Sequence, residues 1–211
     1  MSLPVTASLL AEDVSLIEAS EFWQRQRLDI VQTSVGKVFV KAQRKGWHPF
    51  RYNLLNAIAF LVRMPMIKAA SAPGGQAAQA MEVRRLQSLR DAGVQVPAVL
   101  HAAPQWFAMQ FVDAPNLLDC MQREQPQLER LNSWLQGAEG IGHVHRNGQA
   151  LSQAFARNCL LHERQIWFID FEDDPTQVMS LSHAQARDWL AYLHSTVWAL
   201  RQCGVSWEEM L

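Results

Sequence analysis

The chain has 211 residues, 49% of them hydrophobic and 18% charged, which is typical of one compact domain or of two small lobes. Its net charge of −1 excludes the strong basic field that attracts nucleic acid, so we expect no nucleic-acid partner. The three cysteines are widely spaced and form no metal-ligand pattern. Residues 1–16 lack the basic cluster of a signal peptide, and the longest apolar run, Ala57 to Val62, is too short to span a bilayer. We therefore expect a cytoplasmic protein.

The first half of the chain predicts strands with helices around them. Residues 5–27 are expected to be helical or irregular. Four segments with strand-like composition are predicted as strands, the first two joined by a turn at residues 33–36: Leu28–Gln32, Lys37–Gln43, Val94–Leu100 and Trp106–Val112. Gln76–Ala92, dominated by Ala and Gln, predicts a helix that Gly93 ends.

The second half is predicted to be mainly helical, with one β-hairpin at residues 158–171. The expected helices are Leu117–Arg123, Leu128–Arg146 and His183–Gln202. The last of them carries Leu190, Leu193, Val197 and Leu200 as its apolar positions. This order favours an α+β fold, with a β-rich lobe at residues 1–114 and a mainly helical lobe at residues 115–211. The join would lie near Val112 to Asn116.

The hairpin carries the most informative motif of the chain. Asn158 stands before its first apolar run, and the second run ends in Asp170. An ionised carboxylate at the edge of a core is costly unless it is paired or bound to a metal, so Asp170 is a candidate metal ligand. The alternatives are an aspartate that caps the next turn and, for Asn158, an ordinary turn residue. Asp173 and Asp174 could add ligands, but we expect them to lie in a solvated loop.

The motifs RNCLL and IDFED resemble those of protein-kinase-like phosphotransferases, most closely the bacterial lipopolysaccharide-kinase and Bud32-like group. The resemblance covers about residues 28–200 and implies a small two-lobed protein-kinase-like fold that uses ATP and Mg²⁺. The chain also resembles choline-kinase-like enzymes, because it has an acid, Glu172, at the position where protein-kinase-like enzymes usually have glycine.

The resemblance assigns a role to each matching residue. Lys41 in VFVK would neutralise the α- and β-phosphates, and Glu82 would pair with that lysine and hold it in place. Asn158 and Asp170 would hold the metal, with Glu172 close to it. The alternative for Lys41 and Glu82 is a pair of unconnected surface residues.

Two departures from the family pattern concern catalysis. Gln153 stands where the family has its catalytic aspartate, five residues before Asn158, and it would at best orient the acceptor. No glycine-rich loop precedes Lys41, because Gly36 is the only glycine between the two expected strands there. The loop Pro73-Gly74-Gly75 could hold a phosphate at the start of the following helix, or it could be a plain linker.

The segment 47–70 is basic and amphipathic, with aromatic residues between its arginines and lysines. It could lie on the inner membrane or bind an acidic glycolipid, and the alternative is a helix that packs between the lobes. His143 and His145 are expected to serve packing or the end of a helix rather than metal binding.

Three functions fit these residues. The first is ATP- and Mg²⁺-dependent transfer of phosphate to a hydroxyl acceptor, either a lipopolysaccharide-type glycolipid or another small molecule. The second is a pseudokinase, a nucleotide-binding scaffold without turnover, which the Gln153 substitution favours. The third is a Bud32-like ATPase that works in a tRNA-modification assembly.

Overall fold

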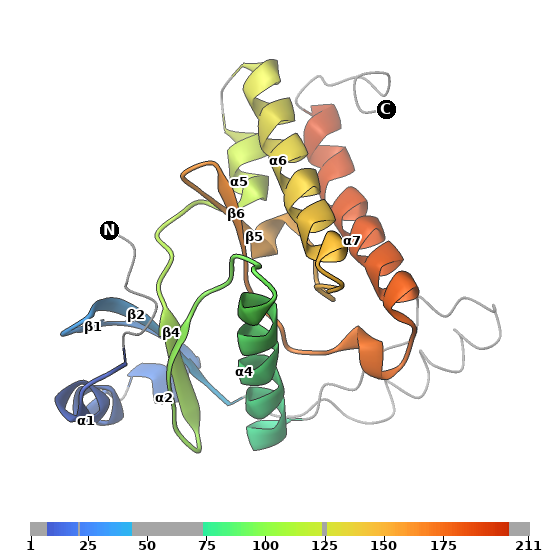
Figure 1. Ribbon diagram of the computed structural model, residues 1–211. Coiled ribbons are helices and arrows are strands. Elements are labelled where there is room, and N and C mark those ends of the chain that lie inside the picture. The colour runs from blue at the N-terminus through green and yellow to red at the C-terminus, as the bar shows by residue number, and fades with distance from the viewer. Residues whose placement is uncertain (1–7, 21, 44–73, 124–125, 203–211) are drawn as a thin grey trace.

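The computed structural model describes residues 8–20, 22–43, 74–123 and 126–202 (Figure 1). The segment 47–70 and Pro73, for which the sequence suggested anion or membrane contacts, lie outside the described residues. The elements in chain order are α1 (Ala11–Ala19), α2 (Phe22–Gln26), β1 (Leu28–Thr33), β2 (Gly36–Ala42), α4 (Gly75–Asp91), β3 (Val99–Ala102), β4 (Trp106–Gln110), α5 (Leu117–Gln122), α6 (Gln127–Arg146), β5 (Cys159–His162), β6 (Gln165–Phe168) and α7 (Leu181–Gln202). Two 3₁₀ turns, Ala156–Asn158 and Pro175–Gln177, flank the β5–β6 hairpin.

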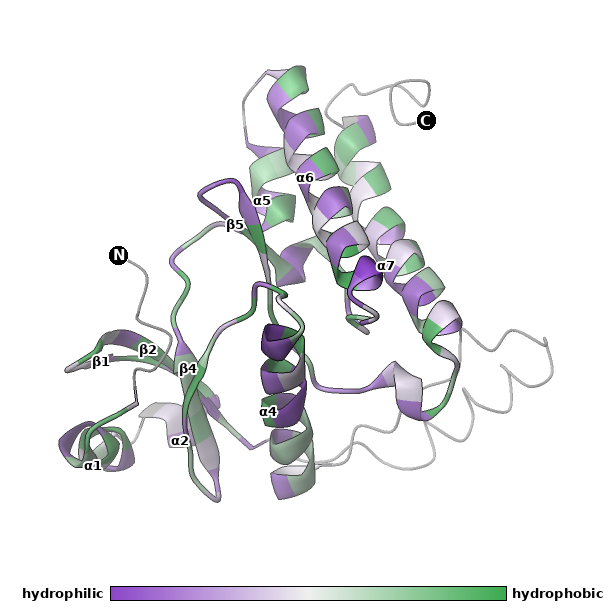
Figure 2. Cartoon of the chain, in the orientation of Figure 1, coloured by the Kyte–Doolittle hydropathy of each residue, from purple (hydrophilic) through white to green (hydrophobic). Residues whose placement is uncertain are grey.

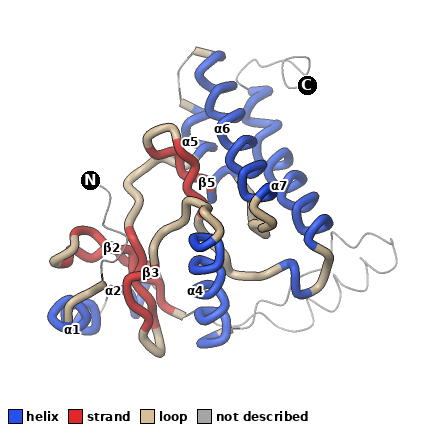
Figure 3. Tube along the Cα trace, viewed as in Figure 1, coloured by secondary structure: helices blue, strands red, loops and turns tan. Residues whose placement is uncertain are grey.

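The molecule has the α+β architecture that the sequence predicts. Strands β1 to β4 lie on one side, helices α5, α6 and α7 lie on the other, and α4 lies between them (Figure 3). Residues 111–116 connect β4 to α5, whose first turn is capped by the Asn116 side chain. Within the described residues no helix is both long enough and apolar enough to cross a membrane.

The four-stranded antiparallel sheet has the order β1-β2-β4-β3. Successive side chains of a strand point to opposite faces, so Val38 and Val40 pack with Trp23 on one face. Phe39 points to the opposite face, where it packs against the larger core cluster, which includes Leu86 and Leu89 of α4. Lys41 points to the same face as Phe39 and therefore toward α4. The sheet register therefore fixes the direction in which the lysine points.

Helix α4 begins and ends within a residue of its predicted bounds. Gly93 has a φ of +78° and lets the chain reverse after the helix, with its N–H donating to the Arg90 carbonyl at 2.9 Å. The strand expected at Val94–Leu100 is wrong at its start, because the strand runs from Val99 to Ala102. Pro97 has no N–H for a strand ladder, and the chain before it packs as an extended segment.

Helix α7 buries only part of the face that its predicted apolar positions mark. Leu200 is buried as expected, but Leu190 and Leu193 are exposed. Most of its buried side chains recur every four residues: Ala184, Asp188, Tyr192, Thr196 and Leu200. Apolar and polar bands alternate along α6 and α7 in Figure 2. Gly137 of α6 allows α7 to pack closely against α6. A Cβ at this position would overlap the Tyr192 hydroxyl and lie 2.5 Å from Leu117 Cδ1.

Candidate active site

Lys41 and Glu82 form a buried ion pair between the sheet and α4. The lysine Nζ lies 2.7 Å from Glu82 Oε1, and the two residues are only 7% and 4% exposed. A surface position for either residue, the alternative from the sequence, is therefore wrong. Glu82 belongs to the buried face of α4 together with Met81 and Leu86, so helical periodicity aims its carboxylate at β2.

The chain after β6 brings two more carboxylates to the same ammonium. Asp170 Oδ1 lies 3.1 Å from Lys41 Nζ, and Glu172 Oε1 lies 3.4 Å from it. Glu172 also accepts a hydrogen bond of 2.6 Å from Arg27 Nη2. Asp170 has a φ of +70°, a left-handed conformation that is costly for a residue with a Cβ and that recurs at functional sites.

Burial and charge compete at this cluster. Burial alone would lower the pKa of Lys41, but the three carboxylates outweigh it, so its pKa is raised and the lysine stays charged. For Glu82, burial is the larger influence and raises the pKa of the carboxyl, while Lys41 opposes the shift. A buried ammonium needs a carboxylate beside it, so we take the pair to be ionised at neutral pH.

Asn158 and Gln153 lie together in the loop before β5. Asn158 is buried, and its Nδ2 donates to the Gln153 carbonyl at 3.1 Å. This bond fixes the orientation of the amide and leaves Oδ1 as the atom available to a metal. The Gln153 side chain is close enough to Asp173 to lower the pKa of that carboxyl, against the larger, opposite effect of burial. The substituted position therefore lies beside the candidate metal residues.

Two acids hold this loop. The sequence predicts no role for Asp188 and places Asp173 in a solvated loop. Asp188, fully buried in α7, accepts hydrogen bonds from the backbone N–H groups of Leu151 at 2.7 Å and Ser152 at 2.8 Å, and from His145 Nε2 at 3.0 Å. Asp173, expected in a solvated loop, is buried and accepts a hydrogen bond from the Ser152 hydroxyl. Burial raises the pKa of Asp173, while Ser152 opposes that shift.

The sequence marks Asp188 only as an acid directly before the apolar run Trp189 to Leu193. His145 lies at the end of α6 and contacts Trp189 edge-on, which agrees with the packing role expected for it. Ser152 has a φ of +83°, so the bonds to Asp188 also hold a strained backbone.

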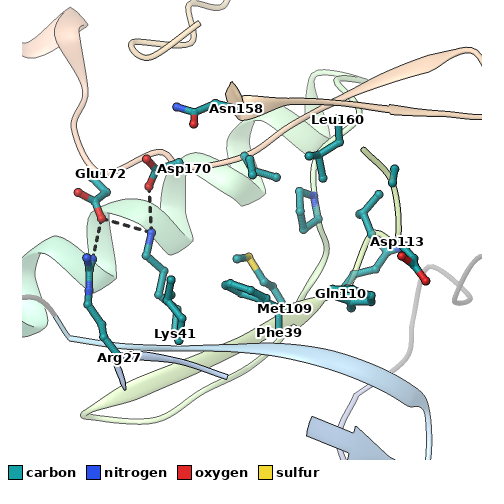
Figure 4. A pocket seen from close by; sticks show the side chains of 16 residues that line it. Arg27, Phe39, Lys41, Met109, Gln110, Asp113, Asn158, Leu160, Asp170 and Glu172 are labelled. Atoms are coloured by element: carbon teal, nitrogen blue, oxygen red, sulfur yellow. Dashed lines mark hydrogen bonds and ion pairs between the residues drawn. The ribbon is translucent and has the colours of Figure 1, made fainter. Parts of the chain in front are cut away.

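A cavity of about 610 Å³ lies beside Lys41, Asn158 and Asp170. It is large enough for a nucleotide-sized ligand. Apolar side chains form its walls between the sheet and the β5–β6 hairpin: Phe39, Met109, Leu160 and Ile169. Charged side chains gather at one end, as Figure 4 shows: Arg27, Lys41, Asp170 and Glu172. Gln110 and Asp113 lie toward the opposite end, by the chain that follows β4. The cavity thus has an apolar body and one strongly charged end.

The donor set at the charged end suits Mg²⁺. The residues named from the sequence, Asn158, Asp170 and Glu172, offer only oxygen atoms, and Mg²⁺ is commonly held by one or two carboxylates together with phosphate oxygens. Figure 4 shows Asn158 and Asp170 on the same side of the cavity. Among the described residues there is no cluster of three or more His, Cys, Asp or Glu side chains that could hold a metal by themselves. The oxygen donors of Asn158 and Asp170 fit a metal that also binds phosphate oxygens.

Comparison with known families identifies a domain in this chain. The family model of the RIO domain (RIO1) matches residues 75–193, which is more than half of the chain. The matched range contains Glu82, Asn158 and Asp170, whereas Lys41 precedes it. No curated protein matches the chain.

Proposed function

The chain belongs to the RIO-domain family of atypical, protein-kinase-like kinases, and from the site we propose that it is an ATP- and Mg²⁺-dependent phosphotransferase. The observation that carries the proposal is the convergence on Lys41 Nζ of Glu82 at 2.7 Å and Asp170 at 3.1 Å, at the charged end of a nucleotide-sized cavity. Those two residues are 41 and 129 positions away from the lysine along the chain. A structural ion pair alone gives no reason for this cavity or for a third carboxylate.

Each residue has a distinct task in this proposal. The adenine ring would lie between the apolar walls, and Lys41 would bind the α- and β-phosphates while Glu82 keeps its ammonium in place. Asn158 and Asp170 would hold Mg²⁺, with Glu172 as a further candidate ligand. When bound, the metal neutralises the charge that develops on the transferred phosphoryl group.

Gln153 makes us expect slow turnover rather than none. An amide cannot take the proton of the acceptor hydroxyl as a carboxylate would, and a general base contributes about 10²–10⁴-fold in typical enzymes. Phosphoryl transfer depends mainly on positioning and charge neutralisation, which Lys41 and Asp170 would still provide. Gln153 would orient the acceptor hydroxyl.

The pseudokinase remains the second candidate, because Gln153 and the absence of a glycine-rich sequence before Lys41 both favour binding without turnover. For the acceptor we propose a hydroxyl compound, with a lipopolysaccharide-type glycolipid as the first class to test. Support for that class, and for contact with the inner membrane, comes from the sequence resemblance and from the basic segment 47–70. A Bud32-like ATPase would instead co-purify with partner proteins.

The experiment that separates these functions measures ADP formation from ATP with and without Mg²⁺, in the presence of candidate acceptors. We expect slow, Mg²⁺-dependent ADP formation that Asp170→Ala abolishes and that Gln153→Asp raises by about 10²–10⁴-fold. If wild type and Gln153→Asp both stay at the level of Asp170→Ala while nucleotide binds, the protein is a scaffold and the transferase proposal is wrong.

A further inference from the structure

The cavity has no phosphate-covering loop where the kinase-like pattern leads one to expect it. The turn between β1 and β2 is tight, with Thr33 paired to Gly36 and its hydroxyl donating to the Gly36 carbonyl at 2.7 Å. It contains one glycine and is at the far end of the hairpin from Lys41. Gly75, from the other loop considered, packs near the Gln43 side chain. Within the described residues, the position that such a loop would take on the sheet side is therefore open to another group.

The register of the sheet places Arg27 at that position. Leu28 of β1 is directly opposite Lys41 of β2. One residue further along, Arg27 lies opposite Ala42, whose N–H donates to the Arg27 carbonyl at 2.8 Å. Arg27 itself has a φ of +65°, and its N–H donates to the Trp23 carbonyl at 3.0 Å. The backbone thus holds Arg27 beside Lys41 in a strained conformation of the kind that recurs at functional sites.

The side chain of Arg27 lines the charged end of the cavity, and Figure 4 shows it directed toward Glu172. A single oxygen, Glu172 Oε1, lies 2.6 Å from Arg27 Nη2 and 3.4 Å from Lys41 Nζ. Two cations therefore converge on one anionic oxygen, the arrangement that would receive a phosphate oxygen. The Arg27 Nε–H is buried and has no hydrogen-bond partner among the described residues, so the guanidinium has spare donor capacity.

Charge favours the same role. Among the described residues, the ion pairs at this end join two cations, Lys41 and Arg27, to the carboxylates of Glu82, Asp170 and Glu172. Removing Arg27 takes one positive charge from the end of the cavity that would face a polyphosphate. The planar guanidinium of an arginine can bind two phosphate oxygens at once.

We propose that Arg27 binds the phosphate chain of the nucleotide from the sheet side, in place of a glycine-rich loop. When no phosphate is bound, Arg27 donates its hydrogen bond to Glu172. When the nucleotide binds, Arg27 contacts both Glu172 and the phosphate. This inference rests on the proposed nucleotide site and adds a phosphate-binding residue that lies outside the matched family range.

The test is calorimetric titration of wild type, Arg27→Ala, Arg27→Lys and Arg84→Ala with ATP and with adenosine. Arg84 is an exposed arginine on α4 and serves as the matched control. We expect Arg27→Ala to weaken ATP binding at least tenfold while adenosine binding is unchanged, with a smaller loss in Arg27→Lys and none in Arg84→Ala. The loss in Arg27→Ala should persist in EDTA, because an arginine–phosphate contact needs no metal, whereas the effect of Asp170→Ala should then disappear.

Other outcomes would overturn the proposal. Unchanged ATP affinity in Arg27→Ala, with wild type binding ATP, would exclude Arg27 as a phosphate ligand and leave the nucleotide site standing. Equal weakening of ATP binding and adenosine binding would mean that Arg27 maintains the shape of the cavity and does not bind phosphate. If the folded wild type bound neither ligand, the nucleotide site itself would be wrong. A thermal melt of each variant confirms that it is folded.

Discussion

Replacing Asp188 should be the most damaging single change to the loop that carries Gln153 and Asn158. Its carboxylate is fully buried and accepts two backbone N–H groups, from Leu151 and Ser152. Asp188→Ala leaves both donors buried without an acceptor, at about 1–3 kcal/mol each. His145 also loses its partner. Because such losses are not additive, we expect a total of about 3–5 kcal/mol.

Thermal and urea denaturation followed by circular dichroism would measure this effect. For a chain of this size, 1 kcal/mol corresponds to about 2–4 °C in Tm, so Asp188→Ala should melt roughly 6–20 °C below wild type. Asp188→Asn keeps one acceptor oxygen and should lose about half as much. Glu139→Ala, which removes an exposed acid from α6, is the control and should change stability by less than about 0.5 kcal/mol. A loss below about 1 kcal/mol in Asp188→Ala would refute the role of Asp188 as the anchor of this loop.

Two further predictions concern the contact between α6 and α7 and the hydrogen bonds that join α1 to the β1–β2 turn. Gly137→Ala should destabilise the protein by about 1–3 kcal/mol, because the new Cβ would overlap the Tyr192 hydroxyl; an unchanged Tm would mean that α6 and α7 are not packed this closely. Asp13→Asn should cost about 1–2 kcal/mol at neutral pH, because Asp13 accepts hydrogen bonds from the Ser34 hydroxyl at 2.6 Å and the Ser34 N–H at 2.8 Å. These hydrogen bonds hold the pKa of Asp13 below its usual value of 3.8, so its stabilisation is present above that pH and is lost as pH falls through the lowered pKa. Urea denaturation across pH should therefore show the two proteins converging in acid, and a constant difference would contradict the assignment.

The parts of the fold that follow local patterns could be predicted from the sequence. The β1–β2 hairpin, α4 and the β5–β6 hairpin lie where periodicity and turn residues place them. Lys41 and Glu82 were recognisable because both stand on regular elements whose order matches a known pattern. Their distance of 2.7 Å follows from packing those elements together.

The remaining site residues depend on partners far away in the chain, which no local pattern reveals. Arg27 meets Glu172 across 145 positions, and Asp188 reaches the backbone of residues 151 and 152 across about 36. Leu200 of α7 is buried as predicted, whereas Leu190 and Leu193 are exposed, because the helix packs through a face that includes the buried Asp188 with its backbone donors. Asp173 was misjudged for the same reason, since its partner Ser152 lies in another loop.

Calorimetric titration of MgATP into wild type, Lys41→Ala and Asp170→Ala tests the nucleotide site most directly. We predict saturable binding by wild type, at least tenfold weaker binding by Lys41→Ala, and loss of the Mg²⁺ dependence in Asp170→Ala, with Arg84→Ala unchanged. No binding by the folded wild type, or equal binding by all four proteins, would contradict a nucleotide site built on Lys41 and Asp170.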